Sequence, residues 1–188
     1  FQGTVEGTNL RATVSLRVSE DSVVFPEGID YGLKEAVFDE VYKRNRNKNL
    51  NDPIYKREVL QITYLNASDK THGLTNLKEL EHFTNLQTLI LRNDALNGTL
   101  DSASLSSLQR LTNLRHLDLR GNQIEQITSL RNLINLNHLD IRHNFIEDFS
   151  PLKDLTGLRT LYLKYNSTID FSPLRQIYYN LHYKDFDL

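Results

Sequence analysis

A segment of 22 residues that recurs along the chain constrains its fold more than any other feature. Residues 113–133 read NLRHLDLRGNQIEQITSLRNL, and residues 135–155 read NLNHLDIRHNFIEDFSPLKDL. The shared pattern is LxxLxLxxN, and it occurs as LQTLILRND, LRHLDLRGN, LNHLDIRHN and LRTLYLKYN. Repeats of about 20 to 50 residues are typical of solenoids, in which each unit buries its apolar face only against its neighbours.

The spacing of the units is regular except at one step. The units begin at Ile62, Leu86, Leu114, Leu136, Leu158 and Leu181. The second step is 28 residues and the others are 22 to 24. The long step contains about six extra residues within ALNGTLDSASLSSLQRL, which we expect to bulge on the convex side with a short helix at 104–110. This insertion is either a tolerated surface loop or part of a functional face.

The LxL core of each unit alternates apolar and polar side chains. Leu117 and Leu119 point to one face of a strand, while His116, Asp118 and Arg120 point to the other. One unit cannot bury such a face alone. Stacked units therefore predict a parallel sheet with strands about 4.8 Å apart.

The last residue of the pattern forms a polar column. Asp94, Asn122, Asn144 and Asn166 occupy the same position in successive units. A buried Asn amide can bond the backbone of its own turn and of the next coil, which satisfies groups that no strand reaches. Asp94 has no amide donors, so its turn is expected to differ.

These motifs resemble a known family. The segment FIEDFSPLKDLTGLRTLYL is similar to the units of bacterial internalin-like leucine-rich repeat proteins, and the resemblance covers about residues 62–188 and the cap before them. It implies an α/β fold, a leucine-rich repeat solenoid. The concave face would be a curved parallel β-sheet, the convex side would have short helical, 3-10 or extended segments, and an α-helical cap would precede the array.

Residues 25–61 are predicted to form that cap. YGLKEAVFDEVYKRN predicts an amphipathic helix of about three turns. Its apolar face comprises Leu33, Ala36, Val37, Val41 and Tyr42. The cations of residues 43–48 would form its polar end, where the helix dipole favours them. DPIYKREVLQITYL predicts a second helix, with Asp52 as N-cap and Pro53 as its first residue.

The two ends of the chain differ from the repeats. Residues 1–24 alternate apolar and polar side chains, which predicts a short N-terminal β segment of two strands. So short a stretch cannot form a domain, and we expect a remnant of a preceding Ig-like module or a tail, derived from a tag or paired with the cap. Near the other end, Lys184 stands where a leucine is expected, which indicates a last, hydrated strand or a break within the array.

Composition and motifs exclude several classes of function. The chain has no cysteine, so disulfides, thiolate metal sites and cysteine nucleophiles are excluded. It lacks GxGxxG, GxxxxGK[ST], GxSxG and HExxH, and we predict no enzymatic activity and no cofactor. A net charge of −2 argues against nucleic acid, and no apolar stretch is long enough for insertion into a membrane. We expect a monomer.

The resemblance and the absence of cysteine together favour a location at the cell surface or secretion, in a bacterium of the Gram-positive type. A cytoplasmic location is the alternative, because repeat proteins that regulate phosphatases share the 22-residue unit.

Candidate site residues are the polar residues of the strands, which stacking arranges in columns on the concave face. The candidate ligand-binding residues are Arg92, His116, Asp118, Arg120, His138, Asp140, Arg142, His143, Tyr162, Lys164 and Tyr165. Four of them form a cationic column beside two aspartates. This surface is either a solvated face that neutralises itself or a recognition surface for a partner with acidic and aromatic groups.

Several ligands fit these columns. A protein, such as a receptor on a host or cell surface, is the first candidate, and a glycan is the second. His116, His138, Asp118 and Asp140 could instead gather around a divalent metal, although repetition alone brings such residues together. The cationic column could also hold phosphate groups or a sulfated glycan. An intracellular scaffold that regulates a partner enzyme and a structural spacer in a large surface protein are the competing functions.

Overall fold

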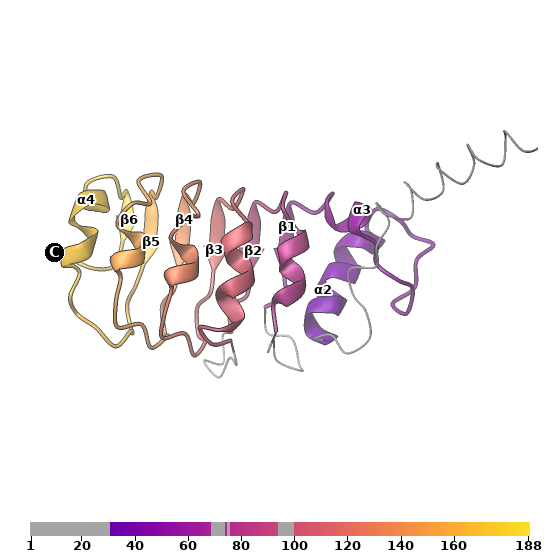
Figure 1. The fold of residues 1–188 in the computed structure, drawn as a ribbon, viewed down its shortest axis with the longest axis horizontal. Coiled ribbons are helices and arrows are strands. Elements are labelled where there is room, and N and C mark those ends of the chain that lie inside the picture. Colours follow the sequence, from indigo (N-terminus) through magenta and orange to yellow (C-terminus); the bar gives the residue numbers. More distant parts are fainter. Residues whose placement is uncertain (1–30, 69–73, 75, 94–99) are drawn as a thin grey trace, which may run out of the picture.

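The computed structural model describes residues 31–68, 74, 76–93 and 100–188, and its centre is one parallel sheet. Its strands are β1 (Tyr64–Asn66), β2 (Thr88–Ile90), β3 (His116–Asp118), β4 (His138–Asp140), β5 (Thr160–Tyr162) and β6 (Tyr183–Lys184). They lie side by side in chain order (Figure 1), so each coil contributes one strand. The predicted parallel sheet of a leucine-rich repeat solenoid is confirmed.

Short helical segments return the chain from one strand to the next, on the other side of the coil (Figure 1). They are η1 (Lys78–His82), η2 (Ser104–Arg110), η3 (Thr128–Leu130), η4 (Ser150–Leu152), η5 (Ser172–Leu174) and α4 (Arg175–Tyr178). All but α4 are 3-10 helices. The helix predicted at 104–110 has the expected bounds, but its hydrogen bonding is 3-10.

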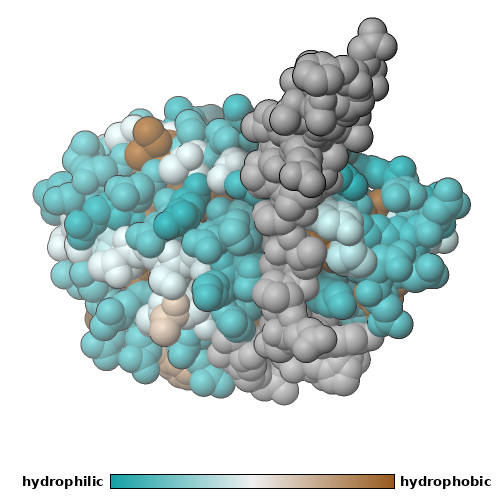
Figure 2. All heavy atoms as spheres, turned by 45° about the vertical axis from the view of Figure 1, so that its right-hand side comes forward, coloured by the Kyte–Doolittle hydropathy of each residue, from teal (hydrophilic) through white to brown (hydrophobic). Residues whose placement is uncertain are grey.

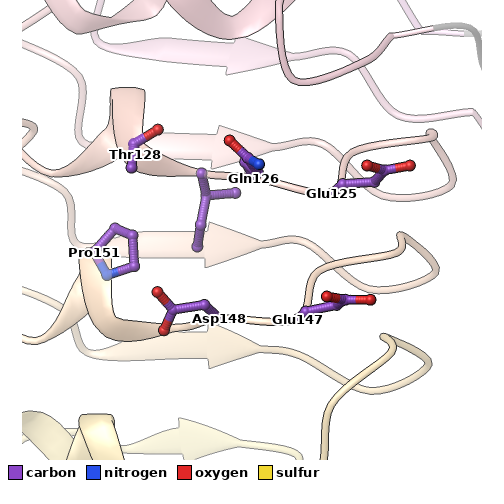
Figure 3. Close-up of a pocket in the computed structure, with 7 residues that line it drawn as sticks. Glu125, Gln126, Thr128, Glu147, Asp148 and Pro151 are labelled. Carbon is purple, nitrogen blue, oxygen red and sulfur yellow. The ribbon is translucent and has the colours of Figure 1, made fainter.

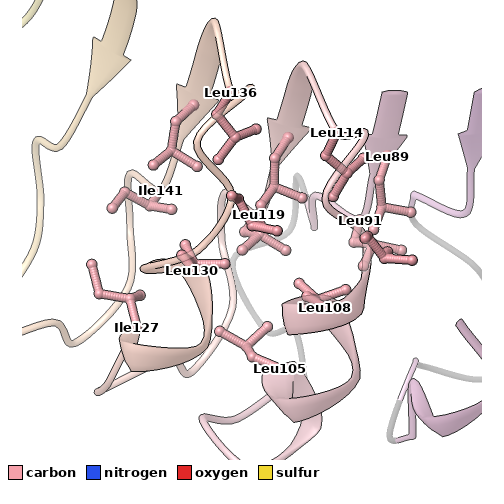
Figure 4. Packing of buried hydrophobic residues seen from close by; sticks show 14 of the residues in the cluster. Leu89, Leu91, Leu105, Leu108, Leu114, Leu119, Ile127, Leu130, Leu136 and Ile141 are labelled. Carbon is pink, nitrogen blue, oxygen red and sulfur yellow. The ribbon is translucent and has the colours of Figure 1, made fainter. Parts of the chain in front are cut away.

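A single hydrophobic core extends through the coils, from Leu33 in the cap to Phe186 in the last coil. The strand leucines and the apolar residues of the helical segments interdigitate inside it (Figure 4). Leu89, Leu117, Leu139 and Leu161 are completely buried. Burial of each such side chain contributes about 2 kcal/mol, and a coil obtains that burial only from its neighbours.

The asparagine column is the polar part of the core. Asn144 is 3% exposed, and its Nδ2 donates to the carbonyls of Ile141, 3.0 Å away in its own turn, and Leu119, 3.1 Å away. Its Oδ1 accepts from the backbone N–H of Ile124 at 3.2 Å. The expectation that the amide reaches the next coil is wrong, because Leu119 and Ile124 belong to the preceding coil. Asp94 lies outside the described residues.

A second asparagine column ties the other end of each strand to the preceding coil. Asn85, Asn113 and Asn135 donate through Nδ2 to the carbonyls of Leu60, Thr84 and Thr112, each at 2.8 Å. The equivalent residue in the following coil is Gly157. A Cβ there would lie 3.0 Å from the carbonyl oxygen of Ile134, so a side chain at this position would require a small shift of the neighbouring backbone.

The cap contains the predicted first helix, α2 (Tyr31–Tyr42), whose buried residues include Leu33, Val37 and Val41. The second helix, α3 (Lys56–Val59), is shorter than expected. Asp52 is not its N-cap, because its carboxylate accepts from the N–H of Asn49 at 2.7 Å instead. The predicted β segment of residues 1–24 lies outside the described residues.

In the last coil the strand is short, and a side chain takes over the hydrogen bonds beyond it. β6 pairs through only two residues, and the Asp185 carboxylate accepts from the N–H groups of Leu163 and Lys164 at 2.7 and 3.2 Å. Lys184 does not occupy the core. Its ammonium lies 4.4 Å from the centre of the Tyr178 ring, which agrees with the expectation of a last, hydrated strand.

Outside the core, the surface is largely polar. The face seen in Figure 2 is mostly hydrophilic and carries a few small, separate hydrophobic patches. Within the described ranges, no helix has the length and apolar character needed to cross a bilayer.

Candidate functional site on the concave sheet

The sheet register brings the predicted columns together. His116 lies opposite His138, and Asp118 lies opposite Asp140. The ladder continues past the strands, since the N–H of Gly121 donates to the carbonyl of Arg142 at 3.0 Å. The cationic column of Arg92, Arg120, Arg142 and Lys164 therefore extends over four adjacent coils.

The two histidines form a stacked pair at the middle of the face. Their ring centroids are 4.1 Å apart and the ring planes differ by 6°. Burial lowers the pKa of both rings, although Asp140 opposes the shift. The positive charge of His116, when protonated, further lowers the pKa of His138. Both imidazoles are therefore neutral at neutral pH, and each ring carries one N–H donor and one acceptor nitrogen instead of a positive charge.

The two aspartates are mostly sequestered from solvent. Asp118 is 8% exposed and Asp140 is 4% exposed. Asp118 Oδ1 accepts from the N–H of Arg120 at 3.0 Å, and burial raises the pKa of this carboxyl despite that bond. The Arg142 guanidinium donates to the Asp140 carboxylate through Nε, 3.0 Å from Oδ1, and through Nη2, which bonds Oδ2. The hydrogen bonds to Asp140 raise the pKa of Arg142.

Tyr162 continues the aspartate column into the fifth coil. Its ring meets His138 edge-on at 5.9 Å, and the Arg142 guanidinium lies 4.7 Å from its centroid. Tyr162 and Lys164 also line a hollow of about 490 Å³ at the C-terminal end of the sheet, together with residues 182–187. The face thus ends in a concavity with both aromatic and charged walls.

His143 and Tyr165 lie beyond the cationic column, at the turn that leaves the sheet. Their rings stack with centroids 4.2 Å apart. Both residues have positive φ, 53° and 63°, as does Gly121 at the same position of the preceding coil, with φ 77°.

The metal alternative finds no support in the geometry. In the part of the chain that the structure describes, no group of three or more His, Asp or Glu side chains is arranged to hold a metal ion. Asp140 is already paired with Arg142, and the histidines stack on each other instead of converging on one point.

A second hollow, of about 450 Å³, lies away from the sheet between two coils (Figure 3). Glu125, Glu147 and Asp148 bring carboxylates to it, alongside Thr128 and Pro151. The Asp148 carboxylate accepts from Ser150 N–H at 2.7 Å and from its hydroxyl at 2.6 Å, and these bonds lower its pKa. Negative charge therefore gathers around this hollow.

Three further residues lie around the face, and sequence reasoning missed two of them, Arg159 and Phe145. Arg115 is exposed and Arg159 is half-buried, and both flank the strands on the side opposite the cationic column. Phe145 is 55% exposed and follows the asparagine column. Comparing the same position in successive units would have found Phe145, because its counterparts Gln123 and Ser167 are polar.

Comparisons with known proteins agree with this architecture. A family model described as leucine-rich repeats in two copies matches residues 134–176. No curated protein sequence matches the chain. Among solved structures, internalin C2 from Listeria monocytogenes is 25% identical over 91% of this chain and 92% of its own, with a TM-score of 0.44.

Support for the fold comes from two other solved structures. The internalin inlF from Listeria monocytogenes is 23% identical over 89% of this chain, with a TM-score of 0.50, and the match spans 58% of its own length. A leucine-rich repeat protein from Leptospira interrogans is 22% identical over 61% of this chain and 29% of its own, with a TM-score of 0.51. With the repeat model and the parallel sheet, they show that the chain has the leucine-rich repeat fold that internalins share.

Proposed function

We propose that this chain is a non-enzymatic recognition module whose concave sheet binds an acidic segment of a protein partner. Leucine-rich repeat domains generally bind protein partners and generally act as scaffolds, not as enzymes.

The proposed location of the protein is the surface of a bacterial cell or its secreted fraction. Fractionation of intact cells tests that location, and recovery of the protein only from the cytoplasm would contradict it.

The distribution of charge carries this proposal. Six cationic residues lie on or beside strands β2–β5: Arg92, Arg115, Arg120, Arg142, Arg159 and Lys164. The carboxylates near them are fewer: Asp118 and Asp140 are nearly buried and already bonded, and Asp185 lies at the last coil near Arg142 and Lys164. The chain as a whole has a net charge of −2, so the concave face is positive on an acidic protein. Such a field attracts and orients an acidic partner.

The test uses poly-L-glutamate as probe at low ionic strength. Wild-type protein is expected to bind this polymer and not poly-L-lysine, although its net charge alone predicts the reverse. The double variant Arg120→Glu/Arg142→Glu should lose at least about tenfold in affinity, because it reverses the centre of the cationic column. Circular dichroism verifies that the variant is folded.

A control variant separates the site from the overall charge. Arg131→Glu/Arg175→Glu makes the same change in net charge at two exposed residues of the helical side. This control should keep wild-type affinity. Equal losses in the two double variants, or no binding of poly-L-glutamate by wild type, would overturn the proposal.

A further inference from the structure

The turn after each strand holds a conformation that suits glycine. Gly121, His143 and Tyr165 occupy it in three successive coils, all with positive φ. Side chains with a Cβ rarely adopt this region, because the Cβ approaches the following carbonyl oxygen. Gly121 shows that the fold accepts glycine at this position. Two aromatic residues thus replace the residue that the backbone prefers.

The fold gains limited burial in return. Tyr165 is 68% exposed, and His143 is half-buried, with its ring packed against that of Tyr165. The backbone bond of the turn does not depend on the ring, since the N–H groups of Gly121 and His143 donate equivalently, to Arg142 and Lys164, at 3.0 and 3.1 Å. Strained backbone that carries exposed aromatic side chains is typical of binding sites.

We propose that His143 and Tyr165, the aromatic ridge, bind an aromatic side chain of the acidic partner segment. The cationic residues Arg142 and Lys164 directly precede the stacked pair in sequence. A segment whose carboxylates lie on the cationic column therefore brings its neighbouring residues to the ridge. Aromatic side chains stack favourably and dominate binding at protein interfaces. This inference rests on the proposed function and adds the partner's aromatic residue to it.

The test compares poly-L-glutamate with a random copolymer of glutamate and tyrosine. Wild-type protein should bind the copolymer about tenfold more tightly. The variant His143→Gly/Tyr165→Gly should lose that advantage and bind both polymers alike, while its thermal midpoint stays unchanged or rises because the strain is relieved. Tyr179→Ala removes a tyrosine that is 85% exposed elsewhere, and it should keep the wild-type preference.

The outcomes distinguish this inference from the proposed function. If the glycine variant retains the preference for the copolymer, the ridge is not the aromatic site, although binding of poly-L-glutamate would still support the concave face. If heparin binds more tightly than the copolymer and loses affinity in the glycine variant, the occupant is a sulfated glycan, and the inference is wrong. The inference is supported if the glycine variant loses the preference for the copolymer while Tyr179→Ala keeps it.

Discussion

Replacement of Asn144 by leucine is expected to lower the free energy of unfolding by about 4 kcal/mol. Leucine has the branched shape of asparagine but removes the bonds to the carbonyls of Leu119 and Ile141 and to the N–H of Ile124. The Ile124 N–H would lose its partner, at a cost of about 1–3 kcal/mol, and each carbonyl would lose one of its two amide donors, at about 0.5–1.5 kcal/mol each. Urea unfolding followed by circular dichroism measures the change.

Asn137→Ala is the matched control for that substitution. Asn137 lies in the same coil, but its side chain is exposed. Its replacement should change stability by less than about 0.5 kcal/mol. Similar unfolding midpoints for the two variants would show that the asparagine column does not stabilise the stack.

The substitution Glu58→Ala is expected to have the second large effect, lowering the free energy of unfolding by about 3 kcal/mol. The ammonium of Lys48, whose side chain is 7% exposed, lies 2.5 Å from the Glu58 carboxylate. That carboxylate also accepts from the N–H of Tyr55 at 2.8 Å. Removing one partner of a buried ion pair leaves an uncompensated charge, which costs more than the pair contributes. Urea unfolding again provides the measurement.

Two comparisons make this result specific. Lys43→Ala breaks an ion pair at a lysine side chain that is 61% exposed, and it should cost less than about 1 kcal/mol. The double variant Lys48→Met/Glu58→Ala should be more stable than Glu58→Ala, because no buried charge is left without a partner. A double variant less stable than the single one would contradict this account of the cap.

The repeat made most of the solenoid predictable. A column is a consequence of spacing, so the alignment of Arg120 with Arg142 and of Asn122 with Asn144 follows once units of 22 residues stack. Boundaries in the cap were less predictable. Asp52 and Pro53 are typical of a helix start, yet α3 begins at Lys56, where Glu58 bonds the preceding backbone.

Which charged side chains of the site pair with each other could not be predicted from the sequence, because pairing depends on rotamers and burial. The spacing places Asp118 and Asp140 on the concave face, but it does not reveal that both are nearly buried or that Arg142 pairs with Asp140 of its own strand. Positive φ at His143 and Tyr165 was also unexpected, since glycine occupies that turn in only one of these three coils.

The central claim, that the concave sheet is the binding surface, is tested most directly by mapping contacts in solution. Backbone amide shifts of the 15N-labelled protein would be recorded during titration with poly-L-glutamate. The account predicts that the largest shifts fall within residues 116–120, 138–142 and 160–164. Shifts concentrated in the helical segments at 128–130 and 150–152, with the strands unaffected, would contradict it.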